Sequence, residues 1–322
     1  MTRRAAAYGG PGWRARAKTL GEELRGGRIW APLSCDSEFG RLLAVLLHLP
    51  GPELDGVKNP DAVQHLARVD RRALARELTA LERALKRRGA LAARMPRRVG
   101  NLPGAPPPNL LFARDLFFST REGAVIARMG SRVRAGEEKF ACAALAGLGA
   151  PILRTISGRG LFEGADALWL DRQTVLCGLG RRTNAEGLRQ LAEALRPQGA
   201  RVVPVRLPEG VQHLLGLLQI VDARLALARV SLLPRETLRL LAARGLRVVA
   251  VPENEEVVER QGMNLVTLSP GTVLMPDDCP GLRGLYARAG IRVAAQLRVR
   301  ELRKGAGGLA CAVGVISREP RR

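Results

Sequence analysis

The stretch Gly245-Leu246-Arg247-Val248-Val249 decides the fold, because it is one copy of a joint that recurs along the chain. The residues before it place Leu238 and Leu241 at helical spacing, and an apolar run begins shortly after the glycine. A glycine readily takes the left-handed conformation that ends a helix, and the β-branched residues that follow favour a strand. Each copy therefore predicts an amphipathic helix that leads directly into a strand.

Five copies of this joint divide the chain into units of similar length. Their glycines lie 60, 50, 46 and 45 residues apart, at Gly89, Gly149, Gly199, Gly245 and Gly290. Further strand candidates lie between the helices, over residues 41–49, 123–128, 167–178, 217–229 and 265–275. Each unit has the order strands, helix, strand, which indicates an internal repeat. We predict an α/β fold, a five-unit pseudo-symmetric α/β propeller, in which residues from different units meet at the centre.

The composition is typical of one folded domain with a basic extension. The chain has 322 residues, of which 46% are hydrophobic, enough for a sizeable core. Residues 1–28 are rich in Arg and Gly and lack the apolar stretch of a secretory signal. We expect a flexible extension over residues 1–28 and a single domain over residues 29–322. The Pro-rich segment 103–108 predicts a linker that delivers the following residues as an extended stretch.

Cysteine usage and hydropathy predict the compartment. The five cysteines are odd in number and show no CxxC spacing, so we expect free thiols and neither a disulfide framework nor a structural zinc site. No charge-free apolar run reaches the roughly 18 residues of a membrane-spanning helix. We therefore expect a cytoplasmic protein that does not bind a membrane.

The formal net charge of +22 raises nucleic acid as a partner. Against this, only five of the 52 basic residues are Lys, and the basic residues are spread along the whole chain. Aromatic residues make up only 3% of the chain, which is poor for stacking bases. We interpret the charge as a basic solvated surface and do not expect nucleic acid to be a partner.

Cys311 is the first candidate for chemistry, because it follows the glycine-rich turn 305–308. Its neighbours, residues 309–313, read as a buried strand in which cysteine packs as a small hydrophobic residue. A glycine turn, however, lets backbone approach a ligand closely, and the nearby Arg303 and Lys304 favour a thiolate. The residues alone leave both interpretations open.

Four polar residues upstream are candidate partners of Cys311, although each also has an ordinary structural explanation. His213 stands among apolar residues at a plausible strand start, where a histidine is often structural. Glu163 and Asp166 lie in a short turn, where acids are often solvated or cap a helix. Asp115 follows an arginine with which it could simply pair. A thiol, an imidazole and carboxylates together suit covalent chemistry on a positively charged carbon.

Taken in order, these segments resemble the guanidine-modifying superfamily of arginine deiminases, methylarginine hydrolases and amidinotransferases. The resemblance runs from about Ser37 to Glu319. It rests on Ser37-Glu38-Phe39-Gly40-Arg41-Leu42, Phe112-Ala113-Arg114-Asp115, Phe162-Glu163-Gly164-Ala165-Asp166, Gly180-Arg181-Arg182-Thr183-Asn184, Gln212-His213-Leu214 and Gly307-Gly308-Leu309-Ala310-Cys311. The superfamily has a five-unit α/β propeller fold, in agreement with the repeat.

The resemblance implies a cysteine-dependent hydrolase of the guanidino group of arginine or a derivative. Cys311 is expected to attack and form a thiouronium-type intermediate, while His213, oriented by Glu163, protonates the departing nitrogen and then activates water. The product is expected to be citrulline-like, with ammonia or an amine released. Neither a metal nor an organic cofactor is expected. The residues expected to bind substrate are Asp115, Asp166, Asn109, Phe112, Arg134 and Arg182, with the two arginines on the α-carboxylate.

The chain departs from the deiminase pattern in ways that bear on the substrate. Leu215 stands where deiminases and amidinotransferases carry the Asp of His-x-Asp, and Ala310 and Ala306 replace a frequent His and Arg. Methylarginine hydrolases resemble the chain more closely at position 215. Only about 67 residues separate Leu42 from Asn109, so the helical subdomain of long deiminases has no room.

Several alternatives stay open at this point. An amidinotransferase would use the same first half-reaction and pass the amidino group to an amine. A catalytically inactive member, or an RNA- or ribosome-binding member of the same fold, is the alternative from another class. Homo-oligomerisation is also open. The joint presence of Asp115, Glu163, His213 and Cys311 favours the enzyme.

Overall fold

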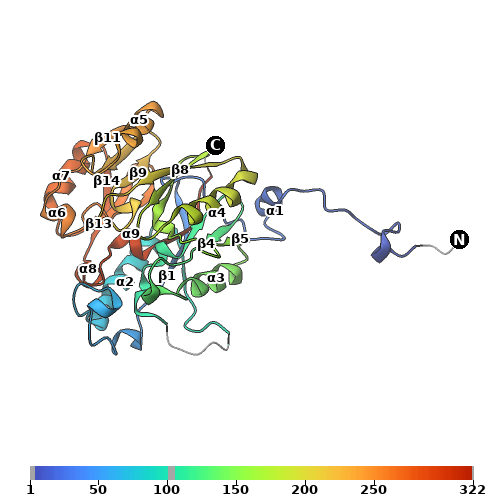
Figure 1. Ribbon diagram of the computed structural model, residues 1–322, viewed down its shortest axis with the longest axis horizontal. Coiled ribbons are helices and arrows are strands. Elements are labelled where there is room, and N and C mark those ends of the chain that lie inside the picture. The colour runs from blue at the N-terminus through green and yellow to red at the C-terminus, as the bar shows by residue number, and fades with distance from the viewer. Residues whose placement is uncertain (1–3, 101–105, 321–322) are drawn as a thin grey trace.

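The computed structural model describes residues 4–100 and 106–320, and Figure 1 shows its helices and strands. The strands are β1 (Leu42–Leu47), β2 (Leu91–Arg94), β3 (Phe117–Ser119), β4 (Ala124–Ile126), β5 (Ile152–Thr155), β6 (Ala167–Asp171), β7 (Thr174–Leu179), β8 (Arg201–Arg206), β9 (Leu218–Asp222), β10 (Leu225–Ala228), β11 (Arg247–Ala250), β12 (Val266–Ser269), β13 (Thr272–Pro276), β14 (Arg292–Leu297) and β15 (Gly314–Arg318). The α-helices are α1 (Leu20–Gly26), α2 (Arg71–Lys86), α3 (Glu138–Gly147), α4 (Ala185–Leu195), α5 (Arg235–Ala243), α6 (Glu255–Val258), α7 (Pro280–Arg288), α8 (Arg300–Lys304) and α9 (Leu309–Ala312).

The described strands form five sheets of three strands, with the orders β15-β1-β2, β3-β4-β5, β6-β7-β8, β9-β10-β11 and β12-β13-β14. In every sheet the middle strand pairs antiparallel with one neighbour and parallel with the other, and a helix connects the parallel pair. The last strand, β15, pairs with β1, so the two ends of the domain complete one sheet together. The prediction of a five-unit α/β fold is confirmed.

The five glycine joints explain why the chain repeats this unit. Gly89, Gly149, Gly199, Gly245 and Gly290 have φ angles of 82°, 78°, 69°, 73° and 85°. Side chains other than glycine rarely adopt this left-handed region, so the glycine lets each helix turn directly into its parallel strand. Local chemistry therefore sets the joint, and burial of the leucine stripe holds the helix against its sheet. On α2, for example, Leu74, Leu78, Leu81 and Leu85 are at most 1% exposed.

Two local expectations were wrong. Residues 309–313 were expected to form a strand, but Leu309–Ala312 form the short helix α9 and the strand begins at Gly314. The reason is a tertiary contact, since the Asn264 side chain accepts hydrogen bonds from two backbone N–H groups of this turn. Asp115 was expected on an extended stretch, but it ends a 3₁₀ turn, η5 (Ala113–Asp115). Of the expected Pro-rich linker, residues 103–105 lie outside the described part of the chain.

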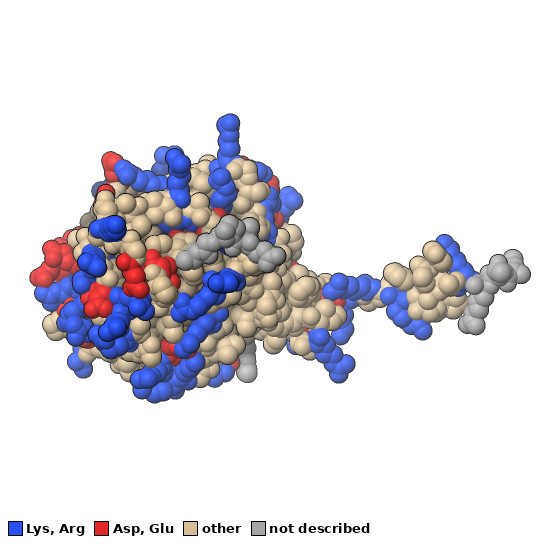
Figure 2. All heavy atoms as spheres, turned by 90° about the horizontal axis from the view of Figure 1, so that it is seen from below, with Lys and Arg blue, Asp and Glu red and all other residues tan. Residues whose placement is uncertain are grey.

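The described residues before α1 project away from the body of the molecule (Figure 1). Helix α1 begins at a capping box formed by Thr19 and Glu22, and its Leu24 is buried. The proposed division at residue 28 stays a prediction. In the face that Figure 2 shows, Lys and Arg side chains are scattered and interrupted by Asp and Glu. None of the described helices combines the length and the apolar character that crossing a membrane requires.

Candidate active site

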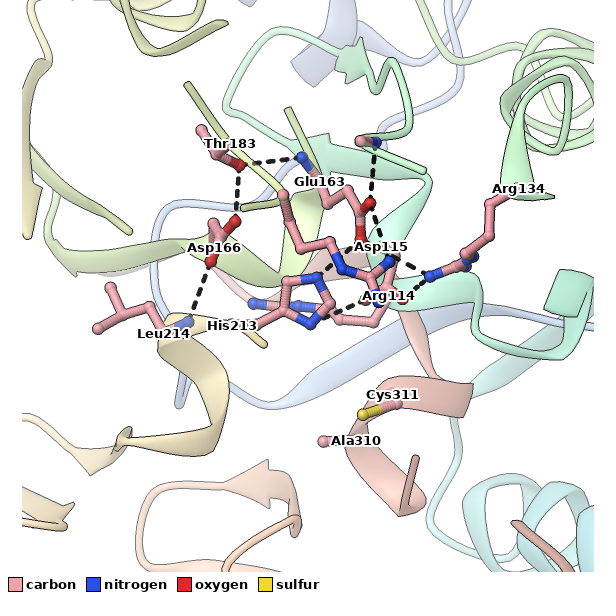
Figure 3. Close-up of polar contacts among 12 residues, drawn as sticks. Arg114, Asp115, Arg134, Glu163, Asp166, Thr183, His213, Leu214, Ala310 and Cys311 are labelled. Atoms are coloured by element: carbon pink, nitrogen blue, oxygen red, sulfur yellow. Dashed lines mark hydrogen bonds and ion pairs between the residues drawn. The ribbon is translucent and has the colours of Figure 1, made fainter. Parts of the chain in front are cut away.

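Turns that precede equivalent strands of the five sheets bring polar residues together. Four of these turns are η5 before β3, η7 (Gly164–Asp166) before β6, η9 (Leu214–Gly216) before β9 and α9 before β15. They carry or flank Asp115, Glu163, Asp166, His213 and Cys311. Figure 3 shows the carboxylates, His213 and Arg134 in one polar cluster, with Cys311 on a separate segment. The pseudo-symmetry of the fold therefore gathers residues that lie far apart in the sequence.

His213 is buried and is held by a carboxylate. Its Nε2 hydrogen-bonds the Oε2 of Glu163 at 2.8 Å, and its Nδ1 lies 3.9 Å from the Oδ1 of Asp115. Burial alone would lower the pKa of His213, but the negative charges of Asp115, Glu163 and Asp166 outweigh it and raise the pKa to about 9. At neutral pH the ring is therefore a cation that can give up a proton.

Glu163 is the fixed anion of this cluster, with no exposed surface. Its Oε1 accepts hydrogen bonds from the backbone N–H of Gly130 (3.0 Å) and from Arg182 (3.4 Å). Burial would raise its pKa, but His213, Arg134 and Arg182 together lower the pKa below the usual range. The carboxylate thus stays charged and holds the imidazole in one orientation.

Asp166 lies behind this pair and is fully buried. The Thr183 hydroxyl donates to one of its oxygens (2.6 Å) and the Leu214 N–H donates to the other (3.0 Å). Burial raises the pKa of Asp166 to about 7. Both oxygens are already used, so the geometry gives Asp166 the place of a brace for the His213 turn. The substrate contact expected for it stays a prediction.

Only one of the two oxygens of Asp115 accepts a hydrogen bond from the described residues. Arg134 donates to Oδ2 at 2.6 Å, whereas the buried Oδ1 has no hydrogen-bond partner among the described residues. Arg134 also donates twice to Glu137, at 3.0 and 2.8 Å. The open alternative that Asp115 pairs with Arg114 is wrong, since Arg114 donates to Glu38 instead. An unpaired buried carboxylate oxygen is costly unless a ligand donates to it.

Cys311 lies on α9 and is partly exposed. Burial of the sulfur and the charge of Asp115 raise the pKa of the thiol, while Asn264, the Gly308 backbone and Arg134 oppose this rise. The Asn264 Nδ2 donates to the Cys311 Sγ at 3.0 Å. Asn264 was missed in the sequence, although it stands two residues before β12 as Asp115 stands two residues before β3. The repeat itself was the signal that could have identified it.

One narrow hollow is lined by Cys311, His213, Asp115, Asn109, Phe112, Arg134 and Arg182, together with Gln64, Gln212 and residues 305–307. It thus contains seven of the nine expected site residues, and Glu163 and Asp166 lie behind it. The space is only about 20 Å³, roughly room for one water.

Asn109 and Phe112 also hold neighbouring segments of the lining in place. Asn109 donates to the Val63 carbonyl (2.7 Å) and hydrogen-bonds His65 (2.9 Å), so its amide holds the segment that carries Gln64. The Phe112 ring lies so close to Gly307 that an added Cβ there would stand 2.2 Å from it. Glycine at 307 is therefore needed for the turn to sit on the ring.

A second, larger hollow of about 520 Å³ meets the first at His213 and Cys311. Its wall includes Leu215, the residue in place of the expected aspartate, and further apolar side chains: Val211, Leu232, Val257 and Met263. The same wall also carries the polar or charged side chains of Glu209, Gln212, Arg229 and Gln261, so the second hollow is mixed in character.

Asp115, Glu163 and His213 have ligand atoms close enough together for a metal ion, all within 4.8 Å of one another. A metal there would need a neutral imidazole. The raised pKa of His213 and the Arg134 guanidinium, 2.6 Å from Asp115, already supply positive charge to the cluster. The metal-free site stays a prediction.

The chain was compared with known proteins. The arginine deiminase family model matches residues 78–224. An arginine deiminase of Listeria welshimeri is 27% identical over 259 residues, covering 66% of this chain and 63% of its own length. The chain spans 65% and 63% of the length of the first curated relatives it matches.

Solved structures agree over most of the chain. The structure of DDAH from Pseudomonas aeruginosa, a cysteine-to-serine mutant complexed with citrulline, has a TM-score of 0.68 at 25% identity and covers 85% of this chain and 99% of its own. An amidinotransferase from Microseira wollei has a TM-score of 0.68 at 16% identity and covers 90% of this chain and 98% of its own. The second likeness concerns the fold alone.

Proposed function

Since the chain belongs to the superfamily of arginine deiminases, dimethylarginine dimethylaminohydrolases and amidinotransferases, we propose that it is a cysteine-dependent hydrolase of a guanidino group, acting on arginine or an arginine derivative. The observation that carries the proposal is the Oδ1 of Asp115, which accepts no hydrogen bond from the described residues and has only the His213 charge 3.9 Å away, in a hollow lined by Cys311 and His213. A guanidinium N–H supplies the donor that this oxygen lacks, and its positive charge suits the carboxylate.

The chemistry begins with Cys311. A bound guanidinium brings positive charge beside the thiol and favours its ionisation, which burial otherwise opposes. The thiol releases its proton to solvent, and the thiolate attacks the central carbon and forms a C–S bond. His213, a cation at neutral pH, gives its proton to the departing nitrogen as the C–N bond breaks. Ammonia or an amine leaves, and a thiouronium-type adduct remains on Cys311.

Hydrolysis completes the reaction. His213 is now neutral, so it takes a proton from a water molecule that attacks the adduct carbon. The C–S bond breaks, the thiolate is released and the product carries a ureido group. Glu163 keeps the ring oriented throughout, and Asp166 braces the same turn. Arg182 and Arg134 are the proposed contacts of the substrate's carboxylate. For this contact Arg134 exchanges one of its present carboxylate partners for the substrate.

Leu215 and its apolar neighbours favour a substituted substrate. Leu215 places no carboxylate beside the guanidinium, and it shares the wall of the second hollow with Val211, Leu232 and Met263, next to Cys311 and His213, where the leaving nitrogen is expected. An N-alkylated nitrogen, which leaves as an alkylamine, suits this wall better than an unsubstituted one. A methylarginine-type substrate is therefore favoured over plain arginine.

The test is a screen of arginine, Nω-methylarginine and agmatine for ureido product, with the Cys311→Ala variant as control. The proposal expects product from the wild type and none from the variant. The same reactions with added glycine address the amidinotransferase alternative, in which no ureido product forms and the amidino group is transferred to glycine. Absence of turnover together with salt-dependent RNA binding that survives Cys311→Ala would instead support the RNA-binding alternative.

A further inference from the structure

Asn264 occupies the place in its unit that the other site residues occupy in theirs. It lies in the turn before β12, as Asp115, Asp166, His213 and Cys311 lie in or beside the turns before β3, β6, β9 and β15. We propose that Asn264 is a positioning residue that holds the Cys311 turn and stabilises the Cys311 thiolate through a hydrogen bond. This rests on the proposed role of Cys311 as the nucleophile.

The orientation of the Asn264 amide follows from its partners. Its Oδ1 accepts from the backbone N–H groups of Ala310 (2.7 Å) and Cys311 (3.3 Å). Backbone N–H groups only donate, so the oxygen must face them and the NH₂ group must face the sulfur. The 3.0 Å contact from Nδ2 to Sγ is therefore a donation to Cys311. A donor at this distance favours the charged thiolate over the neutral thiol.

Gly308 fixes the amide from the other side. An added Cβ at Gly308 would stand 2.6 Å from the Asn264 Cγ, closer than real Cβ contacts come. Its φ of −134° is open to any residue, so close approach, and not backbone conformation, explains the glycine there. The amide is thus clamped between Gly308 and the first turn of α9.

This contact matters because the surroundings of Cys311 otherwise favour the thiol. Asp115 faces the sulfur with negative charge, and the site is buried. Some described groups favour the thiolate instead, and among them Asn264 is the one side chain that donates a hydrogen bond to the sulfur. It does so in the substrate-free enzyme, before any guanidinium arrives.

Two substitutions separate the electrostatic role from a scaffold role. Asn264→Asp keeps an oxygen for the two backbone N–H groups but places a second oxygen against the sulfur. Around pH 8 the introduced carboxylate is ionised, and its negative charge disfavours a second negative charge on the sulfur beside it. The Cys311 thiol therefore stays protonated. Asn264→Ala removes both contacts. A scaffold role predicts that the uncharged Ala variant, once folded, is labelled with the pH profile of the wild type, whereas the proposed role predicts that labelling shifts to higher pH in Ala and at least as far in Asp.

The experiment measures alkylation of Cys311 by iodoacetamide from pH 6 to 10, read by mass spectrometry of its peptide. No substrate is needed, so the result is independent of the turnover screen. Near pH 8, Cys311 in both variants is expected to react at least about tenfold more slowly than in the wild type. This is the effect expected from the loss of one hydrogen bond to a charged group. Asn254→Asp, at the exposed cap of α6, is the matched control and is expected to match the wild type.

Thermal unfolding of each variant accompanies the labelling. Asn264→Asp is expected to unfold near the wild-type temperature, because it keeps the backbone contacts. If it does not fold, Gly308→Ala takes its place, since the added methyl group pushes the amide away from the sulfur and is expected to slow labelling as well. Wild-type labelling rates in a folded Asn264→Asp or Gly308→Ala variant overturn the proposal. Slow labelling with no turnover of any guanidino compound refutes the proposed function and leaves this inference standing.

Discussion

Replacing Glu163 by Gln is expected to lower the pKa of His213 by about one to two units. In the wild type the three surrounding carboxylates overcome burial and raise that pKa to about 9. Glu163 makes the closest contact, 2.8 Å from Oε2 to Nε2, and an opposite charge at such range shifts a pKa by about 1–3 units. Gln keeps a hydrogen-bond acceptor but removes the charge, and Asp115 and Asp166 remain. The imidazole should then titrate between about 7 and 8.

The assay is an NMR titration of ring-labelled histidine, which is practical because the chain has 3 histidines. His48, on Glu53, and His65, on Asn109, serve as internal references. Glu209→Gln, which removes an exposed carboxylate paired with Arg181, is the matched control and should leave His213 unchanged. A His213 that still titrates near 9 in Glu163→Gln, or near 6.5 in the wild type, would refute the reasoning.

The same shift predicts how stability depends on pH. The pKa of His213 is about 9 in the folded protein against 6.5 for the ordinary group, so its contribution is complete below pH 6.5 and is lost as the pH rises through 9. The difference corresponds to about 3 kcal/mol as an order of magnitude, and it should shrink in Glu163→Gln. Leu215→Asp should raise turnover of arginine relative to methylarginine, about tenfold, because it adds a carboxylate beside the unsubstituted nitrogen; an unchanged ratio would count against the apolar wall as the leaving-group side. Gly307→Ala should lower the free energy of unfolding by about 1–3 kcal/mol, as its methyl group meets the Phe112 ring, whereas Gly147→Ala, with open space at its Cβ, should not. Arg182→Ala should raise the KM for arginine more than that for agmatine, which has no carboxylate, and equal changes would contradict the proposed contact.

The sequence revealed the repeat because its signal is local. Each joint combines a helix stripe, one glycine and a β-branched run, and these features act within about ten residues of one another. The positive φ angle at all five joint glycines shows that the same backbone requirement recurs. The closing pair β1 and β15 could not be read locally, because it joins the two ends of the domain.

The sequence singled out residues that the structure brings together, but it did not predict their contacts. Cys311 was assigned to a strand because its neighbours are apolar, and the hydrogen bonds of Asn264 to Ala310 and Cys311 overrode that preference. Glu137 was not singled out at all, although it binds Arg134 through two hydrogen bonds and is fully buried. Such pairings depend on which turns meet at the centre of the ring, and no local pattern encodes that.

The most direct test of the central claim is whether Cys311 carries the substrate carbon during turnover. Wild-type protein is mixed with Nω-methylarginine, quenched in acid within the first turnovers and digested, and the peptide that contains Cys311 is weighed. The account predicts an amidino-type adduct on Cys311 that appears before the ureido product, and it predicts none on the other four cysteines. Ureido product that forms without an adduct, or in the Cys311→Ala variant, would contradict it.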